Sequence, residues 1–240
     1  MISDFMLKKI TIYLIKGVVM KKALVLFLFC FTIISFVFPR DIFYITVYGT
    51  PEELKTAIAA GADVNARTRT GGGWTPLHLI IVMNNSPKVI TVMTMLIEAG
   101  ADVNARDEDG DTPLHLAAAD NTNPDVVTAL LEAGADLEAR EVNDWTPLHA
   151  AASNNKNPAV ITALVKAGAN LEARDKDGWT PLHAAAIKNK NPDAVLVLLE
   201  LGADPKARDA IGQTPWDYIQ TNEALKNSEA YRALNDVQHE

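Results

Sequence analysis

The sequence predicts an all-α solenoid of about six two-helix units, counting the caps at both ends. A hexapeptide, Thr-Pro-Leu-His-Ala-Ala at 180–185, returns with small changes at 75–79, 112–117 and 146–151. A second element, Gly-Ala-Asp or Gly-Ala-Asn, has its glycines 34 residues apart at Gly100, Gly134, Gly168 and Gly202. Self-similarity at a fixed period of this length is typical of chains in which each unit packs only on its neighbours.

Each unit carries start and stop signals for two helices. Thr-Pro places a hydroxyl at a helix N-cap and proline at the first helical position, where its missing N–H costs nothing. Nine residues after the histidine a second helix begins at Asn-Pro, or at Ser86-Pro87 in one unit. The apolar run that follows has helical period and ends at Ala-Gly, where glycine can adopt the left-handed conformation. A turn such as Asp109-Gly110 or Asp177-Gly178 then completes a projecting hairpin loop.

This pattern resembles the ankyrin-repeat family, particularly its bacterial type, over about residues 41–240. The expected units are 41–73, 74–110, 111–144, 145–178 and 179–212, with a C-terminal cap at 213–240. The resemblance implies that each histidine ties the turn of one unit to its neighbour, and that hairpin tips and first helices line a concave groove. Structural roles are therefore expected for Thr75, His78, Thr112, His115, Thr146, His149, Thr180, His183, Gly100, Gly134, Gly168 and Gly202.

The first unit lacks the hexapeptide, so its helices are predicted from the register of the repeat. Residues 42–47 are rich in β-branched and aromatic side chains, which favour a strand by local propensity. Thr50-Pro51 and Gly61, however, stand where the second helix of a unit starts and stops. We therefore expect the first helix of this unit at 42–47.

The next unit is longer than the others, because Gly61 and Gly100 lie 39 residues apart. Two extra residues fall at 71–73, and three fall between Pro87 and Gly100, which would lengthen the second helix by nearly one turn. The run at 89–97 is unusually apolar. We expect it to form a larger buried face, and a stripe facing a membrane or a partner is the alternative.

Residues 1–40 contain an export or membrane signal. Met20-Lys21-Lys22 precedes the mostly apolar stretch Ala23–Phe38, which is typical of a secretory signal peptide or a slightly short membrane anchor. The hydrophobic core ends in Phe36-Val37-Phe38 rather than in a small-x-small cleavage pattern, so both alternatives stay open. We hypothesise that translation starts at Met20. The expected location is the periplasm or the outer side of the inner membrane.

The charge is distributed unevenly along the chain. The net charge is −8, but residues 41–240 carry 16 basic and 29 acidic side chains, a net charge of −13. Such a balance repels phosphate backbones and argues against nucleic acid as the main partner. It is compatible with a basic protein partner, although solubility is the commoner reason for an acidic surface.

The sequence points to no catalytic residue, no metal and no cofactor. It holds no Gly-x-Ser-x-Gly element, no phosphate-binding loop and no His-Glu-x-x-His motif. The four repeat histidines cannot share one zinc ion, because neighbouring helices pack ~8–10 Å apart whereas zinc–nitrogen bonds are only ~2.0–2.1 Å long.

Positions that vary between the units are the candidates for partner binding. Trp74, Trp145 and Trp179 each precede Thr-Pro, where other units have Asp111 or Gln213. Trp145 and Trp179 belong to adjacent units and could form an aromatic ledge, since tryptophan is enriched in binding hot spots. Partial burial against the hairpin is the competing interpretation. The remaining candidates are variable residues at hairpin tips and helix ends, namely Asp107, Glu108, Glu141, Asn143, Lys176, Asn154 and Lys188.

These observations predict a monomeric protein–protein interaction module at the bacterial cell envelope, which binds a protein partner through the groove. Two alternatives remain: a regulator or accessory of an enzyme, and a structural envelope protein. The membrane is expected to be contacted only through the N-terminal segment.

Overall fold

The computed structural model describes residues 41–69, 71–82 and 88–238. Its contacts divide Met1–Asp41 from Ile42–Glu240, and the second of these units holds every helix described below. The predicted signal or anchor at 1–40 and the hypothetical start at Met20 lie outside the described residues. Among the residues that are described, no helix is both long enough and apolar enough to cross a membrane.

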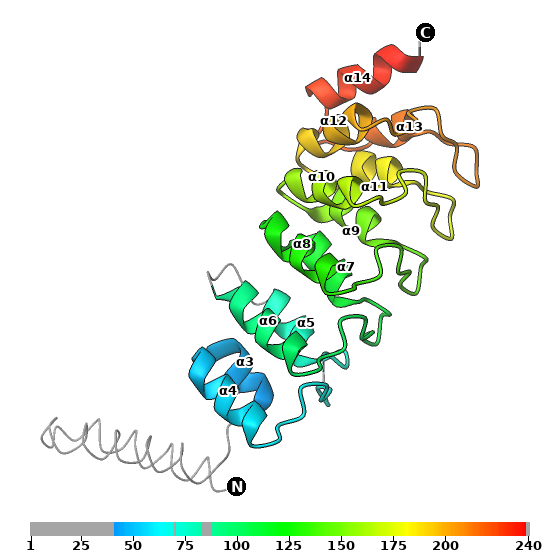
Figure 1. The fold of residues 1–240 in the computed structure, drawn as a ribbon. Coiled ribbons are helices and arrows are strands. Elements are labelled where there is room, and N and C mark those ends of the chain that lie inside the picture. The colour runs from blue at the N-terminus through cyan, green and yellow to red at the C-terminus, as the bar shows by residue number, and fades with distance from the viewer. Residues whose placement is uncertain (1–40, 70, 83–87, 239–240) are drawn as a thin grey trace, which may run out of the picture. The chain divides into compact units, whose positions relative to one another are not determined.

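The part of the chain that the structure describes contains twelve helices and no strand, so the all-α prediction is confirmed. Figure 1 shows the helices following one another in pairs, with the loops between successive pairs projecting to one side. The pairs are α3 (Ile42–Tyr48) and α4 (Pro51–Ala59), α5 (Pro76–Val82) and α6 (Val89–Glu98), α7 (Pro113–Asp120) and α8 (Pro124–Glu132), α9 (Pro147–Asn154) and α10 (Ala159–Lys166), α11 (Pro181–Lys188) and α12 (Pro192–Glu200), and α13 (Pro215–Ile219) and α14 (Glu229–Gln238).

Each helix packs on the equivalent helix of the next unit. The first helices contact one another in the order α3, α5, α7, α9, α11 and α13, and the second helices in the order α4, α6, α8, α10, α12 and α14. Leu114 and Leu148 are at most 1% exposed, and Ala117 and Ala151 are fully buried. One hydrophobic core therefore runs through the whole stack, and the alanines allow neighbouring first helices to approach closely.

The threonine of the hexapeptide forms the N-cap of each first helix from α7 to α13. Thr112 has extended backbone (φ −92°, ψ 165°), and its hydroxyl and backbone N–H both lie within hydrogen-bond distance of Nδ1 of His115, at 2.9 and 3.3 Å. The histidine therefore takes the place that Glu has in the usual capping box. At the end of α8, Gly134 takes φ +91° and the N–H of Ala135 donates to the carbonyl of Leu130, which stops the helix.

The register of the repeat, and not local propensity, decides the first unit. Ile42–Tyr48 is the helix α3, as the register predicted. Ile42 and Ile45 are buried and belong to the common core. Packing against α5 thus outweighs the strand preference of this segment.

The predicted lengthening of the second helix in the long unit is wrong. Helix α6 has 10 residues whereas α8 has 9, so it gains one residue and not nearly a turn. It begins at Val89, and the remaining extra residues precede it. Its apolar run is mainly core: Val92, Met93 and Leu96 are at most 1% exposed. The larger-core interpretation therefore holds for these three side chains.

The turn at Asn143-Asp144 keeps the geometry of the glycine-containing turns. Asp144 takes φ +64° where Gly110 has +83° and Gly178 has +79°, and its N–H donates to the carbonyl of Glu141 at 3.0 Å. Asp tolerates the left-handed region better than most residues with a side chain. The turn is therefore preserved at a modest conformational cost.

Thr46 provides a test of the packing in the first unit. Its side chain is fully buried in α3 and its hydroxyl has no hydrogen-bond partner among the residues that the structure describes, a situation that destabilises a fold. Thr46→Val should therefore raise the free energy of unfolding by about 1 kcal/mol, measured by urea denaturation. Thr146→Val is the matched control, because it removes a cap and should lower that free energy by about 1 kcal/mol. A loss of stability in Thr46→Val would contradict the interpretation that the unpaired hydroxyl of Thr46 destabilises the fold.

Candidate interaction face

The side chains that vary between units meet on one surface, which we call the hairpin face. It is formed by the residue before Thr-Pro in four units and by the last residue of the first helices α7, α9 and α11, namely Trp74, Asp111, Trp145 and Trp179 together with Asp120, Asn154 and Lys188. The four residues before Thr-Pro are half-buried, and the three helix-end residues are exposed. This surface contains the candidates that the sequence nominated, apart from those at the hairpin tips.

A ladder of buried histidines fixes the backbone under the hairpin face. Nε2 of His115 lies 3.0 Å from the carbonyl of Trp145, and Nε2 of His149 lies 3.0 Å from the carbonyl of Trp179. Because a carbonyl only accepts, Nε2 carries the proton, while Nδ1 accepts from the threonine of its own unit. Each histidine therefore positions the residue of the next unit whose side chain reaches the face.

These histidines are held neutral by their surroundings. Burial lowers the pKa of His78, His115, His149 and His183 below the ordinary value of 6.5, and this outweighs the hydrogen bonds to backbone carbonyls, which raise it. A neutral imidazole is the form that can donate at Nε2 and accept at Nδ1. The described residues contain no group of three or more His, Cys, Asp or Glu side chains that could hold a metal ion.

A second ladder runs along the hairpins. Arg140 Nη1 donates to the carbonyl of Asp144 in its own turn at 3.1 Å and to the carbonyl of Arg174 in the next unit at 2.8 Å. Because Nη1 of Arg140 bonds to backbone carbonyls of two successive units, this side chain joins neighbouring hairpins.

The tryptophans are anchored to the following unit. Nε1 of Trp74 donates to Asp107 at 3.0 Å, and Nε1 of Trp145 donates to Asp175 at 2.8 Å. Nε1 of Trp179 donates to the hydroxyl of Tyr218 at 3.1 Å. Each indole is therefore fixed in orientation while part of its surface stays exposed.

Lys188 joins the two tryptophans of adjacent units. Its Nζ lies 4.1 Å from the centroid of the Trp145 ring and 5.8 Å from that of Trp179. A cation over an indole face is stabilised by about 0.5–1 kcal/mol at an exposed site. Trp145, Trp179 and Lys188 thus form one cluster, which we call the Trp-Lys cluster.

Asp111 interrupts the tryptophan ladder. It occupies the position of Trp145 and Trp179, and the next hairpin presents Glu141, whose Oε1 accepts from the N–H groups of Asn143 and Trp145. Asp111 therefore lies near the charge of another acid at this junction, where Trp74 and Trp145 instead pair an indole N–H with an acid.

The crowding of acids contributes to a raised pKa of the Asp111 side chain. Burial, followed by the charges of Asp107, Glu141, Asp109 and Asp120, raises the pKa of Asp111 to about 6. In the sequence, Asp111 stands out only as a substitution at a position that carries tryptophan in other units. The signal that could have singled it out was the replacement of an aromatic residue by an acid next to a second acid in the following unit.

Apart from Asn154, the other nominated residues lie on the hairpins and not at the Trp-Lys cluster. The N–H of Glu108 donates to the carbonyl of Gly72, and the N–H of Lys176 donates to the carbonyl of Asn143. Asn154 occupies the helix-end position between Asp120 and Lys188, and its Oδ1 accepts from Ser153 at 3.0 Å. Tyr218 was not predicted from the sequence as a site residue; its hydroxyl donates to Asp209 at 2.5 Å and accepts from Trp179.

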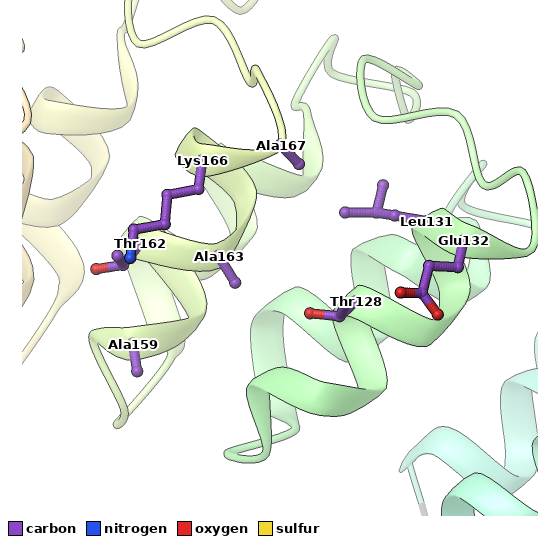
Figure 2. Close-up of a pocket in the computed structure, with 8 residues that line it drawn as sticks. All are labelled: Thr128, Leu131, Glu132, Ala159, Thr162, Ala163, Lys166 and Ala167. Carbon is purple, nitrogen blue, oxygen red and sulfur yellow. The ribbon is translucent and has the colours of Figure 1, made fainter.

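A separate hollow of about 660 Å³ lies between α8 and α10. Figure 2 shows Leu131 of α8 and Ala163 of α10 pointing toward the opposite helix, with Thr128 and Glu132 on the α8 side. Alanines and threonines make up most of its lining, and the hydroxyls of Thr128 and Thr162 donate to the carbonyls of Pro124 and Pro158.

Comparison with known proteins agrees with this architecture. A family model described as "Ankyrin repeats (3 copies)" matches residues 42–141 and 118–209. The chain therefore belongs to the ankyrin-repeat family, and the predicted family and solenoid fold are confirmed. Ankyrin repeats are protein–protein interaction modules.

Relatives match over short segments of their own length. The chain is 52% identical over 52 residues to a fibronectin type 3 and ankyrin repeat domains 1 protein of Mus musculus, which covers 22% of this chain and 14% of the relative. It is 41% identical over 76 residues to protein fem-1 homolog A of Danio rerio, covering 28% and 12%. It is 46% identical over 65 residues to the nuclear factor NF-kappa-B p105 subunit of Gallus gallus, covering 27% and 6%.

The closeness of Asp111 to Glu141 and other acids predicts a pH-dependent gain of stability in Asp111→Asn. Because the pKa of Asp111 is raised from 3.8 to about 6, its ionisation costs more in the fold than in the unfolded chain. The variant should be more stable than the wild type at pH 7.5, by on the order of 1 kcal/mol after allowance for the partial exposure of this group. The difference should shrink as pH falls below 6 and vanish near pH 4.

Urea unfolding at several pH values measures this difference. Asp120→Asn is the control, because it removes an exposed acid near the same place and should give a smaller gain. An equal gain at pH 7.5 and pH 4 would show that the stabilisation of Asp111→Asn does not come from its charge.

Proposed function

We propose that this chain binds a protein partner through the hairpin face, with the Trp-Lys cluster as the centre of contact. The observation that supports this most directly is Lys188 Nζ held at 4.1 Å over Trp145 and 5.8 Å over Trp179. Together these residues offer two indole faces and a cation on an exposed surface.

The framework residues leave the hairpin face as the variable part of the molecule. The histidines, threonines and arginines of the repeat form their hydrogen bonds within the stack, largely to the backbone. Positions such as 120, 154 and 188 carry different exposed side chains in equivalent places. A partner can therefore be recognised there without disturbing the fold.

The anchoring of the indoles favours tight binding. Trp145 and Trp179 are held by their Nε1 hydrogen bonds, so little rotamer freedom remains to be lost when a partner packs on them. Tryptophan is among the residues most enriched in binding hot spots. The two rings are therefore suited to carry a large part of the binding free energy.

We propose further that the ankyrin-repeat region, residues 41–240, acts at the bacterial cell envelope, after export directed by the stretch Ala23–Phe38. The support is the sequence itself, in which Met20-Lys21-Lys22 precedes the apolar run. An alkaline phosphatase fusion at the C-terminus should be active, because that enzyme needs disulfides that form outside the cytoplasm. Deleting 21–38 should abolish the activity. An inactive fusion of the full chain would refute the proposal.

A double substitution tests the site of binding. Trp145→Ala with Trp179→Ala should reduce the recovery of the partner at least tenfold, because it removes both indole faces under Lys188. The measurement is quantitative co-purification of cross-linked partners with the tagged full chain. Unchanged recovery would exclude the Trp-Lys cluster as the contact centre.

Trp74→Ala is the matched control for this experiment. It loses the same kind of Nε1 hydrogen bond to the next hairpin, to Asp107, but lies outside the Trp-Lys cluster. It should retain the partner, and all variants should unfold cooperatively. Comparable loss of partner in Trp74→Ala would assign the effect to stability.

A further inference from the structure

The charge on the hairpin face changes sign across three consecutive units. The last residues of α7, α9 and α11 are Asp120, Asn154 and Lys188, which hold equivalent positions and are all exposed. They are negative, neutral and positive in that order. The residues before Thr-Pro follow the same trend, because Asp111 is an acid while Trp145 and Trp179 lie under a lysine.

The cationic end is fixed in place by its aromatic neighbours. Lys188 lies over the rings of Trp145 and Trp179, so its ammonium group is held on the hairpin face and samples fewer conformations in solvent. Lys156 and Lys190 are exposed in the loops that follow α9 and α11. An anionic group on a partner would meet a positioned cation here.

The opposite end of the hairpin face, around Asp111 and Asp120, is anionic. The half-buried carboxylate of Asp111 lies among the charges of Asp107, Asp109, Asp120 and Glu141. A cation approaching Asp111 and Asp120 would relieve this repulsion, whereas an anion would increase it. The two ends of the face therefore select opposite charges.

From this gradient we infer that the partner lays an extended segment across the hairpin face, with a Lys or Arg side chain at Asp111 and Asp120 and a carboxylate at Lys188. The inference rests on the proposed function and specifies the chemistry and the direction of its partner. The net charge of −13 over residues 41–240 would by itself favour a uniformly basic partner. The distribution of charge on this face favours a bipolar one.

The spacing of the units sets the distance between the two charges. Neighbouring helices pack ~8–10 Å apart, so two steps from α7 to α11 span roughly 16–20 Å. An extended chain advances ~3.3 Å per residue, which places the basic and acidic residues of the partner about five or six positions apart. Apolar residues between them would pack on Trp145. In the reverse direction like charges would meet at both ends, which gives the site its polarity.

A random 12-residue peptide library displayed on phage and panned against the full chain provides the probes. Enriched peptides should share a basic and an acidic residue about five or six positions apart, in one fixed order. A synthetic peptide with the two charges exchanged should bind at least tenfold more weakly, as measured by fluorescence anisotropy.

Charge-reversal variants locate the two ends. Asp120→Lys and Lys188→Glu should each weaken the selected peptide about fivefold or more, and the double variant should prefer the exchanged peptide. The matched controls are Glu132→Lys and Lys166→Glu, which make the same charge changes at exposed positions beside the α8–α10 hollow. These controls should leave both affinities unchanged.

The possible outcomes separate this inference from the function on which it rests. Peptides that need Trp145 and Trp179 but lack the charge pattern, or that respond to the controls as strongly as to the face variants, overturn the inference and leave the proposed function standing. Peptides whose binding is unaffected by Trp145→Ala with Trp179→Ala overturn both. Failure to enrich any peptide overturns the bipolar segment as the ligand.

Discussion

The hydrogen bond from a buried histidine to the backbone carbonyl of the next unit is the interaction on which the structure depends. His115 and His149 each accept at Nδ1 from the threonine that caps their own helix and approach the following unit at 3.0 Å through Nε2. One side chain thus closes a helix end and sets the distance between two units. Burial keeps the imidazole neutral, and only the neutral form supports both bonds.

The same hydrogen bond connects the fold to the hairpin face. The carbonyls that receive it belong to Trp145 and Trp179, so the backbone of each exposed indole is fixed from below by the previous unit. The indole N–H is fixed from the other direction by Asp175 or Tyr218 of the next unit. A residue on the face therefore takes its position from three units, which makes the surface stiff enough to be selective.

Sequence reasoning succeeded where the determining signals are local or periodic. Thr-Pro and Ala-Gly mark helix ends by the chemistry of adjacent residues, and the period carried this information into α3, where propensity pointed the other way. It failed at α6, because counting extra residues does not tell whether a helix or the loop before it absorbs them. The role of Arg140 also escaped prediction, since its acceptor at Arg174 becomes a neighbour only when the units stack.

The sequence predicted which positions form the hairpin face but not how their side chains are arranged. The tryptophans and Lys188 were each nominated from the sequence, yet the stacking of Lys188 on Trp145 depends on rotamers and on the offset between units. The surroundings of Asp111 also escaped prediction, because its acidic neighbours come from two hairpins and a helix end. Such groupings arise from packing, which a linear pattern of residues does not specify.

The constant register of the bonds between units also bears on how such a chain can change length. Arg140 reaches the carbonyl of Arg174, and Asn155 reaches the carbonyl of Asn121, in each case across 34 residues. Removing or duplicating one whole period would bring identical donors to identical acceptors, so both cut ends would rejoin without a new interface having to be invented. Inserting part of a period would misalign every such bond at that point. A molecule organised in this way can grow or shrink in whole units, and a binding surface can be extended by copying a unit and then altering only its exposed residues.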